Sequence, residues 1–262
     1  MAWRIGVDIG GTFTDVALVE ENTGRIGVAK VPTTPDDFGR GVLDGLHSVM
    51  AKYAIAAKDV SLLAHATTSV TNAILEEKGA DAALIMTRGF RDILELRRSA
   101  RPDLYDLFQD GPHILIPRRN RLEITERIGA DGSVVTPLEE SEISDLVDAI
   151  KARDVKSIAI SLMFSFLNPD HERQLGAALR QAFPDLPVYL SSEVLPEIRE
   201  FERTSTTAIC AYVGPILASY LARLEDTVRG IGLPPIYVMG SNGGVFEAAE
   251  GVSMPAMAVE SG

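Results

Sequence analysis

The sequence predicts a mixed α/β fold in which antiparallel strands open the chain and crossover helices join later strands. Two patterns carry this prediction. The chain begins with three alternating apolar and polar runs separated by short turns. From about residue 136 onward, helical periodicity alternates with short apolar runs, which is typical of parallel crossover units. The 262 residues, 46% of them hydrophobic, suffice for one large domain or two smaller ones.

Three strands are expected at the start of the chain. Residues 3–9 and 13–19 flank a glycine turn, and residues 25–31 follow a second turn. That second turn contains Asn22 and Gly24, which tolerate left-handed backbone geometry. Because both connections are short, the three strands are expected to run antiparallel.

A helix and a short strand are expected next. Thr34 suits an N-cap, and Pro35 suits the first helical position. Apolar side chains then recur on one helical face, at Phe38, Val42, Leu46, Val49 and Tyr53. Residues 62–66 form a short apolar run, and the segment after it predicts a helix that stops at Gly79.

The middle of the chain is less regular. Ala82–Thr87 predicts an apolar strand, but from about residue 96 to residue 132 arginines and scattered prolines replace any regular pattern. Only residues 121–128 alternate as a strand would. We interpret residues 96–132 as an irregular insertion that lies beside the functional site.

Regular alternation returns at Thr136, which is spaced with Glu139 as a capping box. The expected inward side chains of that helix are Leu138, Ile143, Leu146 and Ile150. The later elements are predicted strands at residues 157–164, 186–190 and Ile236–Met239, a helix capped by Asn168, and a long helix from about Glu197.

Composition restricts the class of partner. A formal charge of −12 and a pI near 4.8 argue against a nucleic-acid partner, which requires a broad basic surface. Cys210 is the sole cysteine, so internal disulfides and cysteine metal clusters are excluded, and a reducing compartment fits. The chain enters a strand at once and has no unbroken run of 18 apolar residues. We therefore expect a cytoplasmic protein with no membrane partner.

The turn between the first two strands has the chemistry of a phosphate site. Gly10 and Gly11 can adopt positive φ and lack a Cβ, which lets backbone N–H groups approach a phosphate closely. Thr12 and Thr14 add hydroxyls, and Asp8 adds a hard oxygen ligand at the strand end. A plain tight hairpin is the structural alternative, but the full Asp-x-Gly-Gly-Thr-x-Thr-Asp string favours phosphate binding.

This string resembles the first phosphate loop of the ATPase class that contains actin, sugar kinases and heat-shock chaperones. Its Thr-Phe-Thr-Asp ending is similar to the hydantoinase A and 5-oxoprolinase family. Later strings also resemble that family, namely His65-Ala-Thr-Thr, Gly89-Phe-Arg-Asp, residues 199–207 and Ser241-Asn-Gly-Gly. The resemblance covers the whole chain and implies the actin-like ATPase (ribonuclease H-like) fold.

The resemblance also implies roles for the hairpin residues. Asp8 would hold Mg²⁺ directly or through water, and Asp15 would orient the loop or a water molecule. The phosphates of ATP would lie against Gly10, Gly11, Thr12 and Thr14. The implied reaction is phosphorylation of a cyclic amide carbonyl by ATP before ring opening.

Four further residues are weaker candidates for contacting the substrate, namely His65, Thr68, Asn72 and Asn242. Residues alone leave other roles open. A single histidine is more often part of a core, and a threonine at a strand end can simply cap the following helix. A plain turn explains Ser241-Asn-Gly-Gly equally well.

Other functions share the same nucleotide site. Subunits of acetone and acetophenone carboxylases resemble the same family, and phosphorylating an enolate or bicarbonate would use the same cradle. A non-enzymatic ATP switch and a sugar kinase are further alternatives. The strings after the hairpin favour the amidohydrolase and the carboxylase, whose substrates are cyclic amides and ketones respectively.

The resemblance divides the chain into an N-terminal domain, residues 1–190, and the start of a second hydantoinase A-type domain, residues 191–262. The second phosphate loop and the adenosine site of the family are not found in these residues. We therefore expect a truncated subunit that is inactive alone. The four histidines are scattered, so ring opening is expected to take place elsewhere, and the resemblance implies a hydantoinase B-type partner that carries it out.

Overall fold

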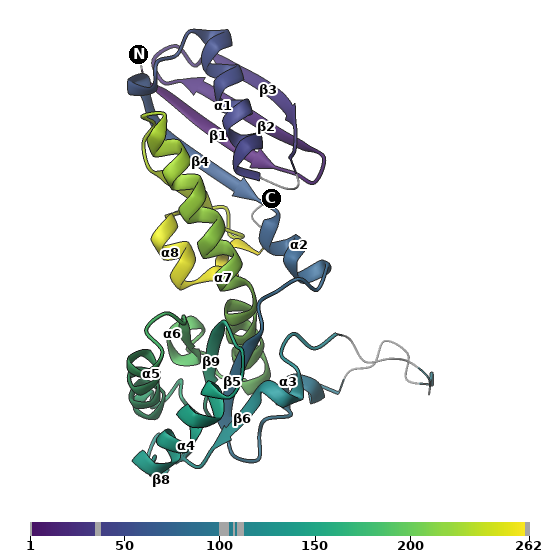
Figure 1. Cartoon of the computed structure of the whole chain (residues 1–262), viewed down its shortest axis with the longest axis vertical. Helices are drawn as coiled ribbons and strands as arrows, with labels where there is room; N and C mark the ends of the chain where they lie inside the picture. The colour runs from purple at the N-terminus through teal and green to yellow at the C-terminus, as the bar shows by residue number, and fades with distance from the viewer. Residues whose placement is uncertain (1, 35–37, 100–104, 107, 109–112, 260–262) are drawn as a thin grey trace. The chain divides into compact units, whose positions relative to one another are not determined.

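The computed structural model describes residues 2–34, 38–99, 105–106, 108 and 113–259, and Figure 1 shows the chain. It forms two compact units. The first comprises residues 1–78 and 216–262, and the second comprises residues 79–215. Residue 190, where the family regions were expected to divide, lies inside the second unit, and that division into family regions stays a prediction.

The first unit contains a six-stranded mixed sheet in the order β12-β11-β4-β1-β2-β3. Its strands are β1 (Trp3–Ile9), β2 (Phe13–Glu20), β3 (Ile26–Pro32), β4 (Val60–Thr67), β11 (Ile236–Met239) and β12 (Val245–Glu247). The first three strands are antiparallel, as expected, whereas β4 is parallel to β1 and β11 is parallel to β4. This arrangement places β1 between β2 and β4, so β1 has a neighbour on each side.

Helix α1 (Phe38–Tyr53) lies across β1, β2 and β3. The expected helical face is confirmed, because Val42, Leu46 and Val49 are all buried. The predicted first helical residue, Pro35, lies outside the described residues. The shorter helices of this unit are α2 (Ser69–Leu75), α8 (Ala248–Ser253) and the 3₁₀ turns Ala57–Asp59 and Pro255–Ala258.

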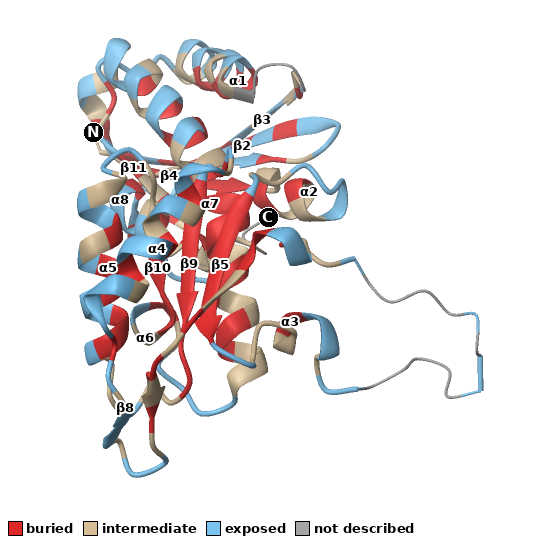
Figure 2. Cartoon of the chain, turned by 60° about the horizontal axis from the view of Figure 1, so that its bottom comes forward, coloured by how far each residue is buried: buried red, intermediate tan, exposed pale blue. Residues whose placement is uncertain are grey.

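The second unit contains a four-stranded parallel sheet in the order β10-β9-β5-β6. Its strands are β5 (Ala82–Thr87), β6 (Arg121–Ile124), β9 (Ser157–Ser161) and β10 (Val188–Leu190). Every residue of β5 and β9 is buried, as Figure 2 shows, which explains their unbroken apolar sequences. The helices of this unit are α3 (Ile93–Leu96), α4 (Glu140–Lys151), α5 (Asp170–Ala182) and α6 (Ser191–Val194).

Two local expectations for the second unit were wrong. The predicted strand at 121–128 is divided: β6 extends the parallel sheet, while β7 (Arg127–Ile128) pairs with β8 (Val134–Thr136). Part of the supposed insertion is therefore a sheet strand, and Arg121 is buried there beside Glu95 at 2.7 Å. The capping box at Thr136 is absent, because Glu139 occupies the N-cap of α4 and makes no side-chain cap hydrogen bond.

The long helix α7 (Glu200–Gly230) begins in the second unit and ends in the first. Among the described residues it is the one helix long and apolar enough to cross a membrane, with an 18-residue window of mean hydropathy 1.3. However, 61% of that window is buried. Burial of this extent is typical of a core helix, so its apolar residues are explained by packing.

Candidate functional site

The hairpin turn between β1 and β2 is open at its tip. Gly10 N–H donates to Phe13 C=O at 3.0 Å and closes the turn. Neither Gly10 nor Gly11 adopts positive φ, so the turn does not need glycine for left-handed geometry. A Cβ built on Gly11 would meet nothing within 4 Å. Glycine therefore leaves open space at the tip instead of relieving backbone strain.

The carbonyl groups of this turn are tied to neighbouring strands. The Thr33 hydroxyl donates to Gly10 C=O at 2.8 Å, and Thr33 N–H donates to Thr12 C=O at 3.0 Å. Within the described part of the chain, no hydrogen bond uses the N–H groups of Gly11 or Thr12. The exposed tip of the turn thus keeps two backbone donors that no group of the described chain uses, and such donors can bind an anion.

Two carboxylates lie beside these donors. Asp8 and Asp15 are directly opposite each other in the β1–β2 register, and both are exposed. Burial, and then the charge of Asp15, raises the pKa of the Asp8 carboxyl above its usual 3.8. Lys30 Nζ lies 3.0 Å from an Asp15 carboxylate oxygen. Asp8 consequently faces a like charge without an ion-pair partner of its own among the described residues.

The predicted role of the Thr14 hydroxyl in the phosphate cradle is not supported. Alternation along β2 turns Thr14 to the face opposite Asp15, where its side chain is fully buried. Since the Thr33 hydroxyl donates to Gly10, the Thr14 hydroxyl donates to the Thr33 oxygen at 3.1 Å. The side chain of Thr14 therefore supports the turn from beneath.

His65 and Thr68 contact the backbone of β1. His65 is 1% exposed, and burial lowers its pKa to about 4, so its ring is neutral. Its Nδ1 lies 3.3 Å from Val7 C=O, and its Nε2 lies 2.6 Å from the Tyr220 hydroxyl. Thr68 donates its hydroxyl to Ile9 C=O at 3.0 Å. Direct contact of either residue with a substrate remains a prediction.

The two asparagine candidates lie in different settings. Asn72 is on α2 and is half-buried, and among the described residues its side chain makes no hydrogen bond. Asn242 lies in an exposed loop, where its side-chain oxygen accepts from Gly244 N–H at 2.9 Å. That contact is sufficient to explain Asn242 as a turn residue, and its role toward substrate stays a prediction.

Sequence reasoning missed Thr33, Lys30 and Tyr220. Thr33 follows β3 directly and reads as an ordinary loop residue before a helix. Lys30 lies opposite Asp15 in the β2–β3 register, so the alternation of the two strands could have predicted this pair. Tyr220 is 155 residues from His65 along the chain, and no local pattern joins them.

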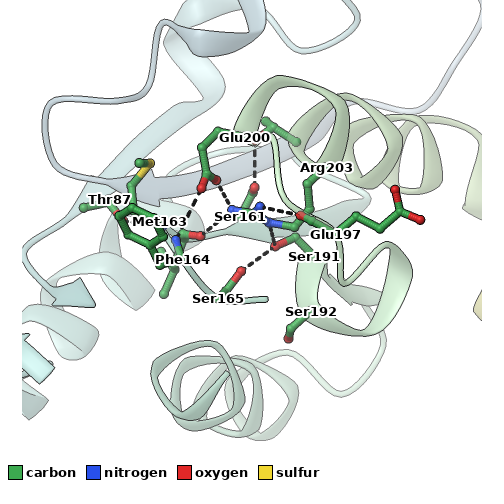
Figure 3. A network of polar contacts seen from close by, with 12 residues as sticks. Thr87, Ser161, Met163, Phe164, Ser165, Ser191, Ser192, Glu197, Glu200 and Arg203 are labelled. Carbon is green, nitrogen blue, oxygen red and sulfur yellow. Dashed lines mark hydrogen bonds and ion pairs between the residues drawn. The ribbon is translucent and has the colours of Figure 1, made fainter. Parts of the chain in front are cut away.

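A second polar cluster lies in the second unit, and Figure 3 shows it. Arg203 is fully buried and donates to Leu162 C=O, Glu197 C=O and the Ser191 hydroxyl at 3.0–3.2 Å, and it also pairs with Glu200. These contacts satisfy the guanidinium with groups of the protein itself. The cluster therefore joins α7 to the ends of β9 and β10, and we assign it to folding.

Fold and hairpin together define the class of protein. The mixed sheet and its glycine turn are those of the actin-like ATPase fold, in agreement with the solved structures named below. Within that class the chain belongs to the hydantoinase/oxoprolinase family. Residues 4–183 match the hydantoinase/oxoprolinase N-terminal region, and residues 203–262 match the hydantoinase/oxoprolinase family itself.

Individual relatives cover nearly all of the chain. Caprolactamase subunit alpha of Pseudomonas jessenii is 36% identical in an alignment that covers 98% of this chain and 37% of that protein. The crystal structure of the ATP-dependent caprolactamase matches with a TM-score of 0.88 at 33% identity, covering 98% of this chain and 39% of that one. Nucleotide-free acetone carboxylase matches with a TM-score of 0.87 at 25% identity, covering 98% and 38%. The chain thus spans less than two-fifths of the length of these relatives.

The raised pKa of Asp8 predicts that Asp8→Asn stabilises the ligand-free protein at pH 7. Folding disfavours the ionised carboxyl, so the native state is favoured below pH 3.8 and loses this advantage as pH rises through the folded pKa. Asparagine carries no charge, so Asp8→Asn removes the free-energy cost of an ionised carboxyl at this position in the folded state. The melting temperature of Asp8→Asn should exceed that of the wild type at pH 7, and the gap should narrow toward pH 4.

Asp44→Asn, in the exposed face of α1, is the matched control and should leave the melting temperature unchanged. An Asp8→Asn protein that melts at or below the wild-type temperature at pH 7 would show that Asp8 carries no electrostatic cost.

Proposed function

We propose that this chain forms one phosphate-binding wall of the ATP site in an ATP-dependent amidohydrolase subunit of the hydantoinase/5-oxoprolinase type. One observation carries the proposal: the unused N–H groups of Gly11 and Thr12 lie beside the paired carboxylates of Asp8 and Asp15. Membership of the family supports it, as does the ATP dependence stated for the caprolactamase relative.

The residues of the hairpin would make different contacts with the phosphates. The N–H groups of Gly11 and Thr12 would donate to phosphate oxygens, and Gly11 leaves room for them. The exposed hydroxyl of Thr12 would contribute a further donor. Because the carbonyls of Gly10 and Thr12 are already bonded to Thr33, the donors need little rearrangement when a phosphate arrives.

The carboxylates fit a magnesium ion. Asp8 and Asp15 are hard oxygen donors on one face, and a cation between them would remove their repulsion. Among the described residues there is no group of three or more metal-ligating side chains, so water and phosphate oxygens would complete the shell, as is usual for Mg²⁺ with nucleotides. Bound there, Mg²⁺ would neutralise charge on the transferred phosphoryl group.

The chemistry that this site would serve is activation of an amide. Resonance makes an amide carbon a poor electrophile. When the carbonyl oxygen bonds to the γ-phosphorus and the bond to ADP breaks, the carbon becomes open to attack by water. After one water adds, the C–N bond breaks, the nitrogen takes up a proton and the ring opens as an acyl phosphate. A second water then releases phosphate and leaves the carboxylate. The hairpin would contribute position and charge neutralisation to the first of these steps.

Ring opening is proposed to take place on a partner subunit of the hydantoinase B type. His65 is buried with both ring nitrogens engaged, and His171 is buried with Nδ1 bonded to Glu126 at 2.7 Å. Neither is placed to act on the intermediate. The relative is itself named a subunit, which supports an assembly of chains. An acidic chain whose single cysteine is buried fits a cytoplasmic location.

The carboxylase is the second candidate. The acetone carboxylase structure shares the fold over nearly the whole chain. Phosphorylation of an enolate or of bicarbonate would use the same donors and carboxylates. The higher identity to the caprolactamase favours the amidohydrolase.

A valine at position 11 should weaken nucleotide binding without unfolding the protein. The side chain would fill the open space at the hairpin tip, and Gly11 has no positive φ for valine to resist. We expect at least a roughly tenfold loss of ATP affinity by calorimetry. In amide NMR spectra ATP should shift Gly11 and Thr12 of the wild type only.

Gly230→Val is the control, because a Cβ there also meets nothing within 4 Å but lies at the end of α7. Unchanged ATP affinity in a folded Gly11→Val protein would place the phosphate site elsewhere.

A substrate panel should separate the candidate functions. We expect this chain alone to bind ATP weakly and to release no phosphate, because phosphoryl transfer needs both walls of a cleft. The whole subunit with its partner should release phosphate with cyclic amides, and not with sugars or with ketones plus bicarbonate. Ring opening should appear only when the partner is added.

Steady, substrate-stimulated ATP hydrolysis by this chain alone, lost in Asp8→Ala, would overturn the need for a second wall. Efficient ring opening without the partner would overturn the division of labour, and phosphate release driven by ketones plus bicarbonate would establish the carboxylase.

A further inference from the structure

The carbonyl groups on both sides of Asp8 are held by side chains from the end of β4. His65 Nδ1 lies 3.3 Å from Val7 C=O, and the Thr68 hydroxyl lies 3.0 Å from Ile9 C=O. Strand β4 runs parallel to β1 with His65 opposite Val7. Two side chains three residues apart therefore contact the carbonyl groups of the residues on either side of the proposed magnesium ligand.

The protonation of His65 follows from its partners. A carbonyl oxygen only accepts, so Nδ1 carries the proton and donates to Val7. The ring is neutral because burial holds its pKa near 4, so Nε2 accepts from the Tyr220 hydroxyl at 2.6 Å. Burial also raises the pKa of Tyr220, which keeps the phenol protonated. Helix α7 thus fixes the ring through Tyr220.

Thr68 has the position of a helix cap without making the bond of one. It is the N-cap residue of α2, yet its side chain makes no cap hydrogen bond. Its hydroxyl instead donates a hydrogen bond to Ile9 C=O. The contact to β1 therefore accounts for a hydroxyl at position 68 better than helix capping does.

We propose that His65 and Thr68 are positioning residues that hold Asp8 in place, and that Tyr220 fixes His65 from helix α7. This inference rests on the proposed function. Its physical reason is electrostatic: like charges directly opposite on neighbouring strands repel, and a free strand end would let Asp8 move away from Asp15. Hydrogen bonds on either side of Asp8 oppose that movement.

Amide hydrogen exchange tests the positioning without any nucleotide. His65→Leu and Thr68→Val remove one donor each. Thr68→Ser keeps the hydroxyl, and His65→Asn keeps an N–H close to the position of Nδ1. The first two variants should exchange the amides of residues 8–10 about fivefold to tenfold faster, the effect of losing one hydrogen bond. The other two should exchange at the wild-type rate.

Amides of β5, in the other unit, serve as the internal control. If His65→Leu does not fold, the Thr68 pair decides alone. Equal exchange in Thr68→Val and Thr68→Ser would overturn the proposal.

Nucleotide affinity tests the consequence for the site. ATP affinity is measured by calorimetry with and without Mg²⁺. In Thr68→Val, the increase in affinity that Mg²⁺ provides should be about tenfold smaller than in the wild type. Affinity for ATP without Mg²⁺ should be unchanged, since Gly11 and Thr12 are untouched. A purely structural role would lower both affinities equally and would contradict the proposal. If the wild type gains nothing from Mg²⁺, the proposed function fails, and the exchange experiment still decides the positioning role.

Discussion

The structure of the site depends on one constraint: carbonyl groups of the β1–β2 turn are hydrogen-bonded to the protein, while the N–H groups at its exposed tip are not. Thr33, which follows β3, bonds to Gly10 and Thr12, and Thr68, which follows β4, bonds to Ile9 beside Asp8. Both strands must therefore reach the same edge of the sheet, and the order β4-β1-β2-β3 brings them there. Helix α1 packs against Thr14, whose hydroxyl is bonded to Thr33 beneath the turn.

The two carboxylates at the hairpin repel each other and therefore oppose this arrangement of the strands. Asp8 and Asp15 face each other in the register, and only Asp15 has a nearby lysine among the described residues. Folding alone would gain by replacing Asp8 with a neutral side chain. The proposed cation would explain its presence, because the two repelling carboxylates would both become ligands. Carboxylates that cost stability in the empty protein are typical of sites selected for binding.

Much of the architecture could be predicted, because apolar periodicity is local: α1, β5 and β11 lie where the pattern placed them. The alternation along β2 also indicates that Thr14 faces the core, although its hydroxyl was expected to belong to the phosphate cradle. The contacts of His65 could not be predicted, since Tyr220 comes from a distant helix. Neither could the two units, because the first is assembled from both ends of the chain. A strand was expected near Arg121, but its place in the parallel sheet could not be predicted, because the burial of Arg121 depends on carboxylates that lie elsewhere in the sequence.

The central claim is that the β1–β2 turn binds the phosphates of ATP. A structure of the whole subunit with Mg²⁺ and a non-hydrolysable ATP analogue tests it most directly. We predict phosphate oxygens at hydrogen-bonding distance, about 3 Å, from the N–H groups of Gly11 and Thr12. We also predict the metal beside Asp8, bound directly or through water. A nucleotide bound with its phosphates away from this turn, while the turn keeps the same conformation, would contradict the account.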